Sequence, residues 1–234
     1  MRCCLVFAQP PADASFAGCD AALVDLSLPD EFPAALAWLP IARAAAAPPL
    51  LYVKTPPPDD PRFAVVLEAL RGAPPDGVLL VGAQGGASVQ QLGARLAVFE
   101  AQAGRADGAT RILAEISTAE GVLALESFAQ CSRRLAALIF DGAALATRLG
   151  VAVDAASVRH ARAKIILAAA AAGLPVLDGL CRAPTALRAE CLAAREDGFS
   201  GKLAAHPGEV ATILAAFGPA RAEKTPQSAG YLRA

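Results

Sequence analysis

Short apolar segments rich in valine, leucine and isoleucine recur along the whole chain, and each is followed by a longer stretch rich in alanine, leucine and arginine. Apolar residues run through these segments without alternating with polar ones, which indicates strands covered on both faces, as in a parallel sheet flanked by helices. The predicted strands are 3–8, 21–26, 50–54, 77–81, 111–117, 136–141, 175–178 and 202–205.

The stretches between the strands carry helix start and stop signals. The predicted helices are 31–47, 61–71, 88–103, 118–134, 155–172, 185–197 and 208–217. Ser88, Thr118 and Thr185 are candidate N-caps, and Gly104, Gly173 and Gly198 are candidate closing residues. Strand and helix therefore alternate along the chain.

Eight strand–helix units in a chain of 234 residues predict an α/β protein with the (β/α)8 TIM-barrel fold. We expect a single barrel domain over residues 1–220, followed by a polar tail over 221–234. A doubly wound open sheet is the alternative. The number of strands distinguishes the two folds. The first and last predicted strands are the ones on which that number depends.

Charge and hydropathy exclude several classes of protein. The 21 basic and 22 acidic residues are scattered and give a net charge of −1, so a nucleic acid is not an expected partner. The longest purely apolar run, 165–172, is too short to cross a membrane, and residues 1–8 are too short for a signal peptide. We expect a cytoplasmic protein whose six cysteines are reduced and lie in the core.

In a TIM barrel, the reacting groups lie at the C-terminal ends of the strands and in the loops that follow. The residues at these predicted positions are Asp25, Ser27, Lys54, Gly82 to Gln84, Ser117, Asp141, Asp178 and His206. A site made from them would contain a lysine, three carboxylates and a histidine.

Several motifs at these positions resemble those of one family. Residues 116–122 read ISTAEGV, residues 138–142 read LIFDG and residues 177–179 read LDG. Residues 198–202 read GFSGK and precede a His-Pro pair at 206–207. Over residues 1–220 the chain resembles the citrate lyase beta subunit-like proteins of the HpcH/HpaI aldolase superfamily. The resemblance implies a TIM barrel that breaks or forms a carbon–carbon bond next to a carbonyl, often in a CoA thioester, with Mg²⁺ stabilising an enolate.

The chain departs from this family at the metal-binding positions. Ser117 stands where the family has a metal-binding glutamate, Ala144 replaces its metal-binding aspartate, and Lys54 replaces an arginine. Because Mg²⁺ prefers carboxylate oxygens, we expect the inherited magnesium site to be weak or absent and assign no cofactor. Asp141 and Glu115 are the fallback ligands, although Glu115 would lie roughly 6–7 Å deeper along its strand than Ser117.

Two hypotheses about function remain open. The first is a carbon–carbon lyase or aldolase that acts on a CoA thioester or a small 2-oxo acid, with Lys54, Ser117, Asp141 and Asp178 binding the substrate. The alternative is a non-catalytic barrel that binds a ligand or a partner subunit. A homo-oligomer formed through the barrel helices is possible under either hypothesis.

Overall fold

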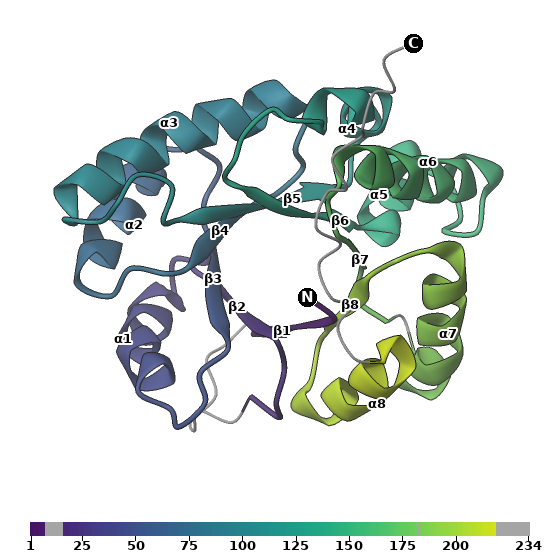
Figure 1. Cartoon of the computed structure of the whole chain (residues 1–234), viewed down its shortest axis with the longest axis horizontal. Coiled ribbons are helices and arrows are strands. Elements are labelled where there is room, and N and C mark those ends of the chain that lie inside the picture. Colours follow the sequence, from purple (N-terminus) through teal and green to yellow (C-terminus); the bar gives the residue numbers. More distant parts are fainter. Residues whose placement is uncertain (8–15, 182, 219–234) are drawn as a thin grey trace, which may run out of the picture.

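A computed structural model describes residues 1–7, 16–181 and 183–218 of the protein. Its strands are parallel and form one closed barrel in sequence order, with β1 hydrogen-bonded to β8 (Figure 1). The strands are β1 (Cys3–Phe7), β2 (Ala21–Asp25), β3 (Leu50–Lys54), β4 (Gly77–Leu80), β5 (Arg111–Ile116), β6 (Leu135–Phe140), β7 (Val176–Asp178) and β8 (Gly201–Ala204). The predicted barrel is confirmed, and the open-sheet alternative is wrong.

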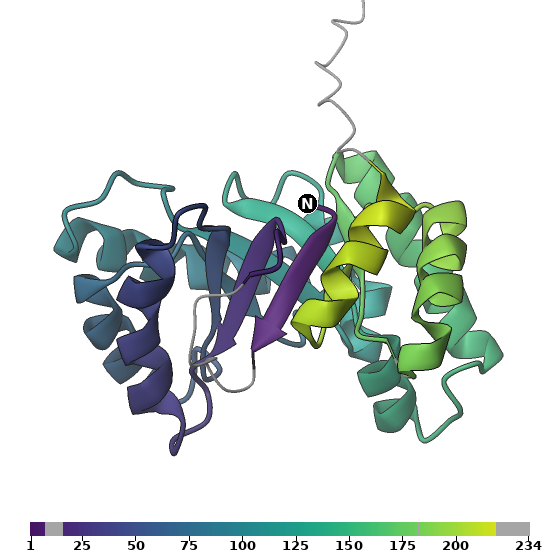
Figure 2. The same cartoon turned by 90° about the horizontal axis from the view of Figure 1, so that it is seen from below.

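The helices surround the barrel, as the view along its axis and the side view show (Figures 1 and 2). They are α1 (Phe32–Arg43), α2 (Arg62–Ala69), α3 (Gly86–Gln102), α4 (Ala119–Leu123), α5 (Gly142–Leu149), α6 (Ala156–Ala172), α7 (Leu187–Asp197) and α8 (Pro207–Phe217). No helix in the described ranges has the length and apolar character needed to cross a membrane. The predicted tail 221–234 and position 8 of the first predicted strand lie outside the described residues.

The strands separate two apolar cores. The larger core lies between the strands and the helices, and the smaller one fills the interior of the barrel. Inside the barrel, Tyr52 packs where Gly77 has no side chain, since a Cβ at that glycine would lie 2.4 Å from the Tyr52 ring. The interior of the barrel is therefore filled with side chains below the C-terminal ends of the strands. A ligand has room only at the mouth, where the strands end.

Helix α5 was not among the predicted helices, although its end signals are present in the sequence. The Asp141 side chain caps its first turn by accepting a hydrogen bond from the Ala144 N–H at 2.9 Å. Gly150 closes it in the left-handed conformation with φ of 67°. A helix of eight residues has too short an apolar pattern to stand out in the sequence.

The single helix predicted over 118–134 is wrong. The chain forms α4, then a 3-10 turn over Leu125–Phe128, and then passes through Gln130 in a left-handed conformation. This segment crosses close to the start of α3, where the Gly86 N–H donates to Ser127 Oγ at 2.8 Å. Packing against α3 therefore overrides the helix propensity of the segment.

Only one of the three predicted N-caps is confirmed. The Thr118 side chain accepts a hydrogen bond from the Gly121 N–H at the start of α4. Ser88 and Thr185 are not N-caps, because α3 begins at Gly86 and α7 begins at Leu187 after a 3-10 turn. All three predicted closing glycines have positive φ and follow α3, α6 and α7.

All six cysteines are free thiols. Four of them are buried, namely Cys3, Cys4, Cys19 and Cys191. Cys131 and Cys181 are partly exposed, so the prediction of core thiols is correct for the first four and wrong for these two.

Candidate functional site

A cavity of about 580 Å³ opens at the C-terminal ends of the strands. Three charged residues on the inner face of the barrel line this cavity, namely Asp25, Lys54 and Glu115. Each lies two residues after a side chain of the interior core, on β2, β3 and β5 respectively. Since side chains of a strand alternate between its two faces, these three project into the barrel above its packed core.

Lys54 and Asp25 form an ion pair at this mouth. They are register partners on β3 and β2, and Lys54 Nζ lies 2.8 Å from Asp25 Oδ2. The Ser27 N–H donates to the other carboxylate oxygen at 2.8 Å. Partial burial pushes the pKa of the Asp25 carboxyl upwards, but the bonds from Lys54 and Ser27 outweigh it and hold this pKa below its usual range. Asp25 is therefore an anion that keeps the Lys54 ammonium in the cavity.

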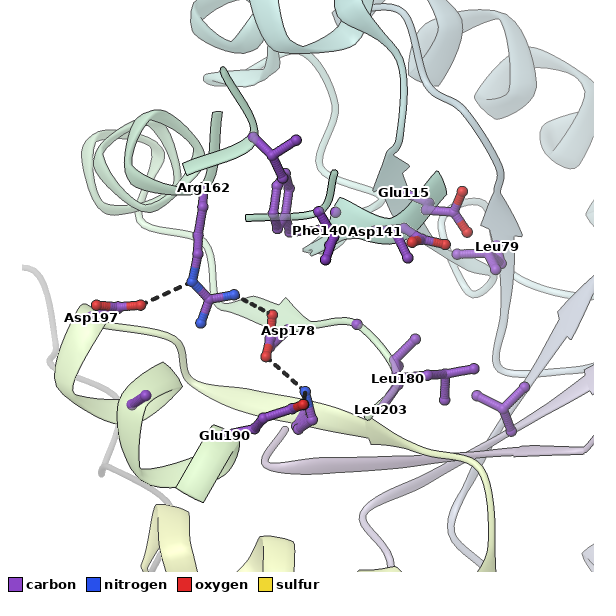
Figure 3. Close-up of a pocket in the computed structure, with 18 of the residues that line it drawn as sticks. Leu79, Glu115, Phe140, Asp141, Arg162, Asp178, Leu180, Glu190, Asp197 and Leu203 are labelled. Carbon is purple, nitrogen blue, oxygen red and sulfur yellow. Dashed lines mark hydrogen bonds and ion pairs between the residues drawn. The ribbon is translucent and has the colours of Figure 1, made fainter. Parts of the chain in front are cut away.

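Glu115 and Asp141 lie on another side of the cavity, next to Leu79 (Figure 3). Burial raises the pKa of the Glu115 carboxyl, and the negative charge of Asp141 adds to this effect, whereas the Ser117 hydroxyl and the positive charge of Lys54 oppose it. The Asp141 carboxylate is partly engaged, because one of its oxygens caps α5. This side of the cavity can therefore accept or hold a proton.

Asp178 belongs to a separate ion-pair network on the outer face of the barrel wall. It follows the inward-facing Leu177, so its side chain points towards the helices. Its two carboxylate oxygens bind Arg162 of α6 at 2.6 Å and Lys202 of β8 at 2.8 Å (Figure 3). Lys202 also contacts Glu190 of α7 at 3.3 Å. Asp178 lines the cavity, but two cations already hold its carboxylate, so substrate binding by Asp178 stays a prediction.

The structure brings Lys54, Asp141 and Asp178 to the cavity wall but leaves Ser117 away from it. The Ser117 side chain is fully buried and does not line the cavity, although its hydroxyl lowers the pKa of Glu115. His206 does not line the cavity either, because its Nδ1 accepts a hydrogen bond from the Gly208 N–H and caps α8.

Several charged residues of the wall were not among the predicted site residues, including residues of the helices α6 and α7. Arg159 of α6 and Glu190 and Asp197 of α7 line the cavity where it extends towards the helices. Arg162 of α6 also lines this part of the cavity and forms ion pairs with Asp178 and Asp197. The sequence offers little signal for the other three, because helices of a barrel are expected to lie outside the site.

Comparison with known proteins relates most of the chain to one family. The sequence model of the HpcH/HpaI aldolase/citrate lyase family matches residues 14–207. The chain belongs to this family. Among solved structures, this HpcH/HpaI protein superposes on RipC from Yersinia pestis with a TM-score of 0.73 and 26% identity, over 93% of this chain and 95% of that one.

A second solved structure and a curated protein are also similar to the chain. The citrate lyase beta subunit from Mycobacterium tuberculosis, solved with oxaloacetate and magnesium, has a TM-score of 0.72 and 24% identity over 93% of this chain and 96% of that one. At 24% identity, this similarity shows the fold alone. A (3S)-malyl-CoA thioesterase from Cereibacter sphaeroides is 34% identical over 115 residues, which are 47% of this chain and 40% of the relative.

The HpcH/HpaI barrel implies Mg²⁺, but the residues present do not fit this ion. Ser117 and Ala144 supply no carboxylate, and Asp141 uses one oxygen to cap α5. Within residues 1–7, 16–181 and 183–218, no three His, Cys, Asp or Glu side chains are arranged to hold a metal ion. Because Mg²⁺ takes hard oxygen ligands in strict octahedral geometry, we derive no catalytic step through it.

Proposed function

We propose that this HpcH/HpaI protein breaks or forms a carbon–carbon bond next to the carbonyl of a small CoA thioester or 2-oxo acid. The observation that carries the proposal is the Lys54 ammonium, held by Asp25 in a cavity at the mouth of a closed barrel. Family membership supports the reaction class, and the malyl-CoA thioesterase relative supports an acyl-CoA substrate.

The cavity wall supplies the two functions that this chemistry requires. Lys54 would donate a hydrogen bond to the substrate carbonyl and stabilise negative charge that develops on its oxygen. Glu115, whose pKa is raised by burial, would accept or return a proton on the opposite side of the carbonyl. The apolar side chains of Leu79 and Leu203 limit access of water to the same space.

The test is a screen of short acyl-CoA thioesters and 2-oxo acids with the purified protein, run with Mg²⁺, with Mn²⁺ and with a chelator. We expect carbon–carbon cleavage, detected by mass spectrometry of the products, and its loss in Lys54→Met. Lys164→Met on α6 is the matched control, since Lys164 does not line the cavity. Release of CoA without carbon–carbon cleavage would indicate a thioesterase, and ligand binding without turnover would indicate the non-catalytic alternative.

Two broader expectations remain proposals. Assembly into a homo-oligomer through the barrel helices would use exposed apolar side chains such as Leu167 on α6 and Val98 on α3. Light scattering of the full chain and of a chain that ends at residue 221 tests this, because both should have the same oligomeric state. A cytoplasmic location is the second proposal, which cell fractionation tests.

A further inference from the structure

Two of the four lysines in the sequence line the cavity, and their surroundings differ. The Lys202 side chain is 2% exposed and contacts both Asp178 and Glu190. The Lys54 side chain is 35% exposed, and the ion pair described for it is with Asp25. Lys54 is therefore the cavity lysine whose Nζ a small ligand can reach.

We propose that Lys54 forms a Schiff base with the ketone carbon of a small 2-oxo acid, as a deeper form of the proposed function and dependent on it. In this position the protonated imine is a cation covalently attached to the reacting carbon. It can accept the electron pair of a neighbouring bond. The iminium would thereby take the place of a metal ion, for which Ser117 and Ala144 supply no carboxylate ligand.

Asp25 is placed to move the protons that this step requires. The Lys54 ammonium passes one proton to Asp25, 2.8 Å away, and the free amine adds to the ketone carbon to give a carbinolamine. The nitrogen then loses a second proton. The oxygen of the former ketone gains two protons and leaves as water. Overall, one ammonium and one ketone give one iminium and one water, so that charge and atoms balance and Asp25 ends as a carboxylate.

The same arrangement accounts for bond cleavage. For a 2-oxo acid with a hydroxyl group on carbon 4, Asp25 takes the hydroxyl proton while the bond between carbons 3 and 4 breaks. The electron pair of that bond enters the iminium and forms an enamine, and the other fragment leaves as an aldehyde or ketone. Protonation of the enamine at carbon 3 and hydrolysis by water regenerate the Lys54 ammonium and release the shorter 2-oxo acid.

This chemistry selects ketones over thioesters. An amine that attacks a ketone forms an imine, which water can reverse. An amine that attacks a thioester expels the thiol and becomes a stable amide, which would inactivate the lysine. The proposal therefore narrows the substrate class from acyl-CoA thioesters and 2-oxo acids to 2-oxo acids.

The experiment is reductive trapping with pyruvate, the simplest 2-oxo ketone acid, and sodium cyanoborohydride in the presence of a chelator. Hydride adds to the iminium carbon and fixes the adduct as a secondary amine, which mass spectrometry of the intact protein and of its peptides detects. We expect one adduct, at Lys54, that requires the reductant and is lost in Lys54→Arg, which keeps a cation beside Asp25. Lys164→Arg should label like the wild type.

The outcomes separate this proposal from the proposed function. Turnover of substrate without an adduct at Lys54 would overturn the Schiff base and leave the lyase function standing. An adduct at Lys54 without turnover of any substrate would support the Schiff base and count against the lyase. Equal labelling of Lys54, Lys164 and Lys224 would overturn the proposal, since it would show only the general reactivity of lysines. A thermal melt of Lys54→Arg confirms that the variant is folded.

Discussion

Lys54 and Asp25 are directly opposite each other in the last pair of residues that joins β3 to β2, and their charged atoms are 2.8 Å apart. Both side chains face the barrel interior, where Glu115 of β5 is a third charged group. Three titratable groups thus share a cavity above an apolar core. In this setting a change in one charge alters the pKa values of the others.

Removal of the Lys54 cation should abolish most of the activity. We expect Lys54→Met to lower kcat/KM by about 100-fold, because the developing negative charge on the carbonyl oxygen loses its stabilising partner. The pKa of Asp25 should also rise, since its bond from Lys54 holds it down. Steady-state kinetics and titration of the carboxyls by NMR measure both effects. Unchanged kinetics in Lys54→Met would place the reaction elsewhere.

Glu115 should make the protein less stable as the pH rises. Its pKa is raised in the folded state, so its carboxyl ionises at a lower pH in the unfolded chain than in the native one. The folded state is therefore favoured at acidic pH, and this advantage disappears as the pH rises through the folded pKa. We expect the free energy of unfolding of Glu115→Gln to increase relative to the wild type as the pH rises from 4.5 through the folded-state pKa of Glu115.

Urea denaturation of the wild type and of Glu115→Gln across this pH range measures the effect. Glu126→Gln is a suitable control, because Glu126 is exposed on the 3-10 turn after α4. A difference between wild type and Glu115→Gln that does not change with pH would show that Glu115 titrates normally.

Glu100 should have the opposite effect on stability. Its side chain, 1% exposed on α3, binds Arg134 and accepts hydrogen bonds from the Gly108 and Thr110 N–H groups. Burial opposes its ionisation, but these bonds prevail and lower the pKa of Glu100 from 4.5 to about 2. The stabilisation, about 3 kcal/mol, is therefore present above pH 4.5 and lost as the pH falls towards 2.

Glu100→Gln should remove this dependence on pH and lower the free energy of unfolding at pH 7 by about 3 kcal/mol. Denaturant titrations at pH 7 and at pH 4 measure the change. Equal stability of the variant and the wild type at pH 7 would show that the pair with Arg134 contributes little.

Asp178 should act mainly on stability. Asp178→Asn leaves Arg162 and the buried Lys202 without the carboxylate that both bind, so we expect a loss of about 3–5 kcal/mol. Asp154→Asn, at an exposed position on the rim of the same cavity, should change stability by less than about 0.5 kcal/mol. A raised KM with normal stability in Asp178→Asn would instead support the substrate-binding role.

The wild-type protein should show no tight binding of Mg²⁺ in a calorimetric titration, because Ser117 and Ala144, at the positions that the family resemblance assigns to metal carboxylates, supply none. Binding should appear in the double variant Ser117→Glu with Ala144→Asp and not in either single variant. Because Ser117 is fully buried, the melting temperature of each variant must be compared with the wild type. Micromolar affinity of the wild type would contradict the prediction.

The wall of the cavity shows which features of a site are encoded locally. Lys54 and Asp141 were predicted at the mouth because each follows an apolar strand, and the structure places both there. Arg159, Glu190 and Asp197 were missed because helices of a barrel normally cover its outside. Ser117 was predicted to bind substrate; its side chain is buried and does not line the cavity, and substrate binding by Ser117 stays a prediction. Position at a strand end does not determine where a side chain points once the chain leaves the strand.

The order of elements, the parallel sheet and the family were readable from the sequence, because apolar periodicity and motif spacing are local properties of the chain. Closure of β1 on β8, the division of charges between the interior and the outer wall, and the approach of α6 and α7 to the cavity were decided only by the tertiary structure. These features depend on strand register and on packing between segments far apart in sequence, where a shift of one residue turns a side chain from one face of the sheet to the other.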